Sequence, residues 1–463
     1  MDLTDLCWLS AVEQKALLDR RDVGVLEMVD AHIERIDRHN PILNAFVTLR
    51  LEEAREEAKS ADAVIANGAA AGVLHGLPIG VKDCFQTKGL RTTFGCVAFK
   101  KHVPDFDHLV VEREKAAGAI ILSKLNTPEF TMAINTCSNP VFGPTRNPWN
   151  LDLCPGVSSG ASGAALAAGL CSLADGSDIG GSVRNPAAWC NIVGLRPTTW
   201  IIPDIPNPSL WNNMNTPGPM ARTVADAALF LSVLSGPDPR CPVPMPAPFP
   251  PGLPDLERDL KGLRIGWSRD HGSLNFDPDI GRNFDDQRIV FESLGCVVSP
   301  RHLDVEDLVD AYMMLAYERV TGDVKPVYDR DRGRLAPSLR DRYEWFSSLR
   351  GEDLGRAEGR RMRLWHDVAA AFDDHDVLVW PDDTHDPYRH DDEEAAQAKD
   401  WRLHYIAPML NLPAVTVPCG FSSNGIPLGL QVTGRPGADL LILQVAHAYE
   451  QATGYGARRP LLD

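Results

Sequence analysis

The chain has 463 residues, of which 44% are hydrophobic, so it holds enough apolar material for a large core and is not expected to be disordered. Its formal net charge of -17 repels phosphate backbones, which argues against nucleic acid as a partner. The opening MDLTDLCWLS lacks the basic and apolar regions of a signal peptide, and no stretch approaches the roughly 18 uninterrupted apolar residues that a membrane span needs. We therefore expect a cytoplasmic protein with no membrane partner.

Helical and strand-like patterns alternate in the first half of the chain. Residues 1–70 are predicted to be mainly helical, because Val25, Val29, Ile33 and Ile36 recur at helical spacing. The stretch GLPIGVKDCF and the end of AAGAIILSKLN are short apolar runs next to glycine or proline, which is typical of buried strands. Apolar strands between helices favour an α/β fold whose sheet is covered on both faces.

The second half follows a proline-rich stretch at 236–260, which predicts an extended connector. A strand restarts in LKGLRIGWSRD, and a mainly helical, charged insert occupies about 300–400. LPAVTVPCGF and LGLQVTG then return to strand patterns, and DLLILQVAHAYEQAT predicts a closing helix. The sequence shows no internal repeat, so we predict one domain, 1–463, in which 261–463 adds to the same sheet.

The segment DGSDIGGSVR carries the strongest sign of chemistry, because two glycines precede Ser182. Backbone without a Cβ can turn sharply and point its N–H groups into a cavity, where they form a nest for a negatively charged oxygen. Such a nest stabilises the tetrahedral intermediate of acyl transfer, and one donor is worth about 3 kcal/mol. Ser182 is therefore a candidate nucleophile, provided that a base activates it.

The base is not a neighbouring histidine, because the segment contains none. Lys82 follows an apolar run that is predicted to be a buried strand, and burial favours the neutral amine of a lysine over its ammonium form. A neutral lysine can accept a proton. We therefore take Lys82 as the candidate base, with Ser158 or Ser159 as the bridge from Lys82 to Ser182.

Several segments resemble the amidase signature family, in the order in which that family has them. PGVSSGASGAALAAG and DIGGSVRNPAAWCNIVGLRPT resemble its signature, and GLPIGVKD, KGLRIGWSRD and LNLPAVTVPCGF resemble other family segments. The resemblance covers nearly the whole chain apart from roughly 300–400, and it places the signature core in 71–235. It implies a single amidase domain with one large mixed β-sheet covered on both faces by α-helices.

The resemblance places the family's Ser-cisSer-Lys triad on three residues: Lys82 as base, Ser158 as bridging serine and Ser182 as nucleophile. It implies a cis peptide bond entering Ser158, although Val157 stands where the family usually has glycine. Protons would pass from Ser182 to Ser158 and on to Lys82, and water would hydrolyse the acyl-enzyme. The implied oxyanion hole consists of the backbone N–H groups of Ile179, Gly180, Gly181 and Ser182.

The resemblance also suggests the substrate class. Family position places Met132, Ala133 and Ile134 in the acyl pocket, and a loop near its expected mouth adds Trp211 and Met214. Such a lining favours a hydrophobic or aryl amide, an anilide, a carbamate or an ester over free glutamine. We expect no cofactor and no metal, and a monomer or homodimer acting on a small-molecule amide or carbamate. The alternative is the glutaminase subunit of a tRNA-dependent amidotransferase, which is one branch of the family.

Other interpretations of the same motifs are weaker. GVSSG also fits the nucleophile elbow of α/β-hydrolases, which would make Ser158 the nucleophile of an esterase with a late base such as His447. However, NLDLCP is a poor strand to precede an elbow, and a structural role is expected for His447. The acidic stretch 373–394 is predicted to be a solvated loop rather than a metal site, because it lacks metal-ligand spacing. Arg184 is expected to support the active-site loop through an ion pair with Asp178.

Overall fold

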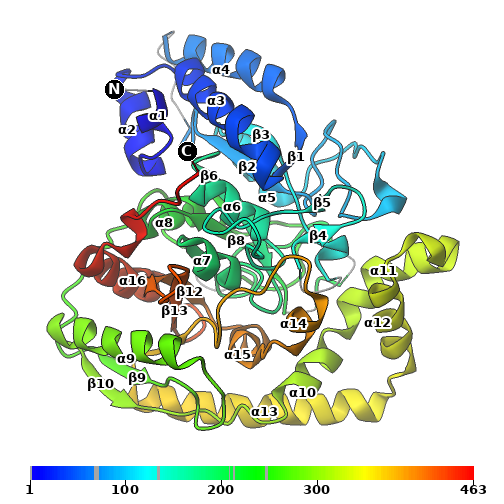
Figure 1. Cartoon of the computed structure of the whole chain (residues 1–463), viewed down its shortest axis with the longest axis vertical. Coiled ribbons are helices and arrows are strands. Elements are labelled where there is room, and N and C mark those ends of the chain that lie inside the picture. Colours follow the sequence, from blue (N-terminus) through cyan, green and yellow to red (C-terminus); the bar gives the residue numbers. More distant parts are fainter. Residues whose placement is uncertain are drawn as a thin grey trace.

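One large sheet organises the chain (Figure 1). The computed structural model describes residues 3–66, 72–132, 136–207, 209–211, 214–245 and 249–462. In this part of the chain, eleven strands pair in the order β1-β3-β2-β6-β8-β7-β12-β13-β11-β9-β10. The strands are β1 (Phe46–Leu49), β2 (Pro78–Lys82), β3 (Ile120–Leu125), β6 (Leu173–Asp178), β7 (Val193–Arg196), β8 (Thr216–Ala221), β9 (Arg264–Trp267), β10 (Val297–Pro300), β11 (Val377–Pro381), β12 (Ala414–Phe421) and β13 (Pro427–Thr433), beside a separate pair, β4 (Ser138–Asn139) and β5 (Gly143–Pro144).

The sheet is mixed, as the sequence predicted. Strand β2 runs parallel to both β3 and β6, and β9 runs parallel to both β10 and β11. The pairs from β6 through β8, β7, β12 and β13 to β11 are antiparallel. Every residue of β2, β3, β6, β8 and β13 is buried, so both faces of the central sheet are covered.

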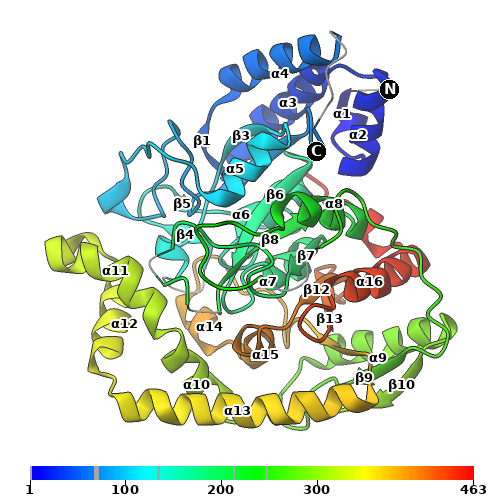
Figure 2. The same cartoon turned by 180° about the vertical axis from the view of Figure 1, so that it is seen from behind.

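Helices lie along the whole length of the sheet. Figures 1 and 2 show α3 and α4 at the β1–β3 end, and α9 and α13 at the β9–β10 end. The helix predicted from Val25 extends to Leu43. The helices are α1 (Leu3–Leu6), α2 (Ala11–Arg20), α3 (Val25–Leu43), α4 (Leu51–Ala66), α5 (Leu109–Ala116), α6 (Gly160–Ala167), α7 (Arg184–Cys190), α8 (Val224–Leu234), α9 (Pro278–Ser293), α10 (Leu308–Leu315), α11 (Tyr317–Asp331), α12 (Pro337–Ser348), α13 (Gly351–Asp374), α14 (Glu393–Ala398), α15 (Arg402–Leu410) and α16 (Asp439–Thr453). None of the helices in the described residues is long and apolar enough to cross a membrane.

The described residues between α8 and β9 form no helix or strand, where the sequence predicts a proline-rich connector. The insert after β10 forms α10 to α13, and α11 and α12 lie side by side at one corner of the molecule (Figures 1 and 2). Val320, Val324, Leu339 and Phe346 of this pair share a small apolar cluster with Met132, in the segment after β3. The insert therefore packs against the segment that is predicted to line the acyl pocket.

The expectation that 373–394 is a solvated loop was wrong for its first half. Val377–Pro381 forms β11, between β13 and β9 in the sheet, and every residue of the strand is buried. Asp382 and Asp383, which follow the strand, are buried as well. Like charges tolerate burial when each has a partner of opposite charge or a hydrogen-bond donor, and both aspartates have such partners from distant parts of the chain.

Candidate active site

Lys82 is the last residue of β2 and has no exposed surface. Its Nζ lies 2.8 Å from the Oγ of Ser158, 2.8 Å from that of Ser159 and 3.0 Å from that of Ser177. The lysine reaches these hydroxyls because β2 pairs in parallel with β6, so the ends of both strands meet at one edge of the sheet. A buried amine among three hydroxyls can exchange a proton with any of them.

Two loops bring the serines to Lys82. The first, which we call the relay loop (156–159), contains a cis peptide bond between Val157 and Ser158 and leads into α6. The second, the nucleophile loop (179–183), joins β6 to α7 and carries Ser182. The N–H of Ser159 donates to the carbonyl of Ser182 at 3.1 Å, so the two loops are in direct contact.

Small residues make this approach possible. All of α6 is buried, and a Cβ on Gly163 would lie 3.0 Å from the carbonyl oxygen of Pro186 in α7. A Cβ on Gly160 would lie 3.0 Å from the Sγ of Cys137. The glycine- and serine-rich sequence is therefore a tightly packed layer rather than a flexible linker.

The two glycines of the nucleophile loop are required by their neighbours. A Cβ on Gly180 would lie 2.4 Å from the Oη of Tyr312, in α10 of the insert. Gly181 has a φ of +100°, and a Cβ there would lie 2.4 Å from the His404 ring. Only glycine fits positions that backbone and rings approach this closely.

Asp178 holds the nucleophile loop through hydrogen bonds to its side chain. Its carboxylate accepts two hydrogen bonds from Arg184, each 3.0 Å long, and further ones from the N–H groups of Gly181 at 2.9 Å and Val183 at 3.2 Å. Burial acts to raise the pKa of Asp178, but Arg184, Arg196 and these donors outweigh it and hold the pKa well below its ordinary value. The carboxylate therefore stays ionised and keeps the loop in one conformation.

The loop leaves N–H groups available to a ligand. Among the described residues, the N–H groups of Ile179, Gly180 and Ser182 have no hydrogen-bond partner, whereas that of Gly181 is taken by Asp178. The Oγ atoms of Ser158 and Ser182 are likewise not joined by a hydrogen bond in this part of the chain. Both serines nevertheless line one cavity of about 290 Å³.

Apolar and aromatic side chains form somewhat more than half of the cavity surface, and polar side chains form the rest. Much of its wall comes from α10, α11 and α12, for which the sequence showed no family motif, and the rest from loops beside the serines and before α15. Of the residues that the structure describes, Arg342 and Lys399 are the charged ones that line it. The lining residues outside the two loops are Pro128, Thr131, Met132, Val309, Tyr312, Met313, Ala316, Val320, Arg342, Phe346, Gln397, Lys399, Trp401 and Tyr405.

The predicted pocket residues are distributed differently. Met132 lines the cavity. Ala133 and Ile134 lie outside the described residues. Trp211 is 72% exposed and Met214 is buried in the core, and neither lines the cavity. The residues that sequence reasoning missed, such as Tyr312 and Phe346, lie on insert helices that carry no motif.

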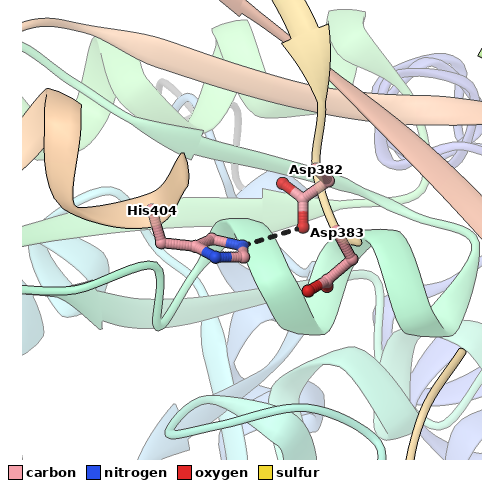
Figure 3. A group of neighbouring side chains, drawn as sticks. All are labelled: Asp382, Asp383 and His404. Atoms are coloured by element: carbon pink, nitrogen blue, oxygen red, sulfur yellow. Dashed lines mark hydrogen bonds and ion pairs between the residues drawn. The ribbon is translucent and has the colours of Figure 1, made fainter. Parts of the chain in front are cut away.

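The alternative base and the metal alternative do not fit. His447 lies on α16, where its ring nitrogens are 3.5 Å from Glu257 and 3.7 Å from Glu450, and it does not line the cavity. Asp382, Asp383 and His404 place possible ligand atoms within 4.8 Å of one another (Figure 3). The oxygens of Asp382 already accept from His404 and Thr416, however, and those of Asp383 from Asn185 and Lys399.

Comparison with known proteins gives one consistent result. The profile of the family described as Amidase matches residues 27–443. The chain is 35% identical to an acylamidase of Rhodococcus erythropolis, with 98% of each chain covered, and 34% identical to a glutamyl-tRNA(Gln) amidotransferase subunit of Moorella thermoacetica, with 99% of each covered. Among solved structures, a bacterial aryl acylamidase of the amidase signature enzymes superposes with a TM-score of 0.90 at 26% identity, covering 98% of this chain and 99% of that one. A 6-aminohexanoate cyclic dimer hydrolase complexed with substrate gives 0.88 at 27% identity over all of both chains.

Proposed function

The chain belongs to the amidase signature family and is a serine-based amidohydrolase, and we propose that its substrates are hydrophobic or aryl amides and anilides, with aryl carbamates and esters cleaved by the same acyl transfer. The observation that carries the proposal is the 2.8 Å contact between the Nζ of Lys82 and the Oγ of Ser158, at the buried base of a cavity that Ser182 also lines. A base, a bridging hydroxyl and a second hydroxyl facing substrate are the parts that serine acyl transfer needs.

In the proposed reaction, the neutral amine of Lys82 takes the proton of Ser158, and Ser158 takes that of Ser182. The Lys82 side chain has no exposed surface, and burial away from water disfavours the charged form of a lysine. Ser182 then attacks the carbonyl carbon, and the same path returns a proton to the leaving amine. The contact between the hydroxyls of Ser158 and Ser182 forms in the substrate complex, since catalytic hydrogen bonds often tighten only there.

The oxyanion that forms on attack is held by the nucleophile loop. The N–H groups of Ile179, Gly180 and Ser182 are the proposed donors, because the described structure leaves them unpaired. Gly181 contributes differently from the family expectation, since its N–H holds Asp178. Its role is to fix the turn that presents the other three.

The cavity wall supports the substrate class. Met132, Met313, Phe346 and Trp401 provide apolar and aromatic surface, and the cavity's 290 Å³ is at the small end of ligand pockets, about 300–1,000 Å³. Such a wall suits an aryl or branched aliphatic group better than the charged ends of an amino acid.

The amidotransferase subunits provide the second candidate function, because one of them is 34% identical over 99% of both chains. The purified chain should be assayed alone on p-nitroanilides, aryl carbamates and glutamine. Turnover of the first two without partner proteins supports the proposal. If glutamine is the one substrate of the three that is hydrolysed, the result favours the second candidate.

Two variants test the assigned roles. Ser182→Ala and Lys82→Ala should each abolish p-nitroanilide hydrolysis, while the exposed control Lys101→Ala should keep wild-type kcat. Circular dichroism checks that all three variants are folded. Full activity in folded Lys82→Ala would end the proton-relay proposal.

A further inference from the structure

Two consecutive aspartates after β11 each connect to one of the two serine loops through another side chain. Figure 3 shows Asp382 bonded to the ring of His404, and that ring lies against Gly181 of the nucleophile loop. Asp383 instead connects to the relay loop. Both carboxylates come from the acidic stretch that carries no family motif.

A buried amide joins Asp383 to the relay loop. One carboxylate oxygen of Asp383 accepts from the Nδ2 of Asn185 at 2.7 Å, and the Oδ1 of Asn185 accepts the backbone N–H of Val157 at 3.0 Å. The backbone N–H of Asn185 donates to the carbonyl of Gly181 at 2.8 Å. Asn185 therefore touches the loops of both Ser158 and Ser182.

The other oxygen of Asp383 is in contact with the Nζ of Lys399, whose side chain has no exposed surface. This ammonium lies 4.3 Å from the ring centres of both Trp189 and Trp401. Burial lowers the pKa of Lys399 to about 7, although the negative charge of Asp382 acts in the opposite direction. Two rings and a carboxylate thus hold the lysine in one place on the cavity wall.

The chemistry of the contacts fixes the orientation of the Asn185 amide. An ionised carboxylate can only accept hydrogen bonds, and a backbone N–H can only donate them. With Asp383 on one side and Val157 on the other, one orientation of the amide satisfies both neighbours and the flipped one satisfies neither. By pairing with Asp383, Lys399 holds that carboxylate where it accepts from the amide, in the orientation that anchors Val157.

We propose that Lys399 and Asp383 are positioning residues, which act through Asn185 to hold the relay loop so that Ser158 stays within reach of Lys82. The inference rests on the proposed function, because it takes Ser158 as the proton carrier. It gives a role to Lys399, whose side chain is 0% exposed and which takes no part in the proposed proton transfer.

The test is a double-mutant cycle with steady-state kinetics on a p-nitroanilide. Lys399→Met and Asp383→Asn should each lower kcat about 10-fold to 100-fold, as small displacements of a catalytic group do, with KM changed less than about threefold. The double variant should be no slower than the slower single variant, because the two residues act as one unit. In the double variant, Lys399→Met also removes the ammonium that would otherwise face the amide introduced by Asp383→Asn. Lys399→Arg, which keeps the cation, should recover part of the lost kcat.

Tyr449→Phe is the matched control, since it removes a buried hydrogen bond, 2.6 Å to the Oε1 of Gln287, that touches neither loop. It should lower the melting temperature and leave kcat unchanged. Wild-type kcat in folded Lys399→Met, or losses that add fully in the double variant, would overturn the inference, as would a raised KM at unchanged kcat, which would mean substrate contact. If Lys399→Met does not fold, Asp383→Asn and Lys399→Arg still decide. An active Ser182→Ala would instead refute the proposed function itself.

Discussion

Gly180→Ala provides a sharp test of how the insert and the nucleophile loop fit together. The new Cβ would lie 2.4 Å from the Oη and 3.0 Å from the Cζ of Tyr312, and 3.3 Å from Tyr405. The Tyr312 ring is stacked on Tyr405, with 3.6 Å between ring centres and 4° between planes, so it can withdraw into the cavity only by giving up this stacking. The loop must therefore shift, and the Gly180 N–H shifts with it.

The expected cost follows from that shift. Overpacking of this kind destabilises a fold by about 1–3 kcal/mol. Displacing one oxyanion donor lowers kcat by about 100-fold or more. Gly355→Ala is the matched control, since a Cβ there meets nothing within 4 Å; on α13 it should leave kcat unchanged and not destabilise the protein.

The assay is p-nitroanilide hydrolysis together with thermal melting, on Gly180→Ala, on Tyr312→Phe and on the two combined. Removing the Oη relieves the 2.4 Å contact and leaves one of 3.0 Å, so the double variant should recover part of the kcat that Gly180→Ala loses. Wild-type kcat in Gly180→Ala would refute the reasoning. So would a double variant in which the two losses simply multiply.

Three further predictions concern the surroundings of the site and the core. Ser159→Ala removes one of three hydroxyls around Lys82 and should lower kcat about tenfold, which corresponds to the free energy of one hydrogen bond. Ser158→Ala should abolish activity, and an equally complete loss in Ser159→Ala would contradict the assignment of Ser158 as the bridge. Burial lowers the pKa of His32 from 6.5 to about 3, so the unfolded state binds the extra proton as pH falls below about 6.5. When the pH falls from 7.5 to 4.5, the free energy of unfolding measured in urea should therefore drop by about 3 kcal/mol more in the wild type than in His32→Asn. Equal drops would show that His32 titrates normally. Overnight dialysis against EDTA should leave kcat unchanged, because a metal ion would have to displace Lys399 from Asp383 and His404 from Asp382; a loss that zinc restores would disprove this.

Motif spacing predicted which short segments lie close together in the fold. Lys82 in GLPIGVKD does lie within hydrogen-bond distance of Ser158 and Ser159, and parallel β2 and β6 bring the ends of their strands together. Apolar runs between helices predicted a sheet covered on both faces, and the family resemblance implied that it is mixed. The glycines before Ser182 could be predicted to shape a turn, but not that Tyr312 and His404 would lie against them.

Sequence reasoning failed where partners come from far apart. The stretch after β11 looked solvated because its charges were counted without their partners, Asn185 and Lys399 for Asp383 and His404 for Asp382. Trp211 was expected at the pocket because the family resemblance places its loop near the expected mouth, yet it is 72% exposed. Proximity along the chain does not say which way a loop turns.

The proposed reacting groups all lie between Lys82 and Ser182, whereas α10, α11 and α12 supply much of the opposite wall from one continuous stretch. A stretch without reacting groups can accumulate substitutions, or be exchanged whole between relatives, while hydrolysis continues. New preferences for acyl or aryl groups can therefore evolve in this stretch alone. For the same reason, a mutant library aimed at a new amide should begin with these three helices and leave the strands untouched.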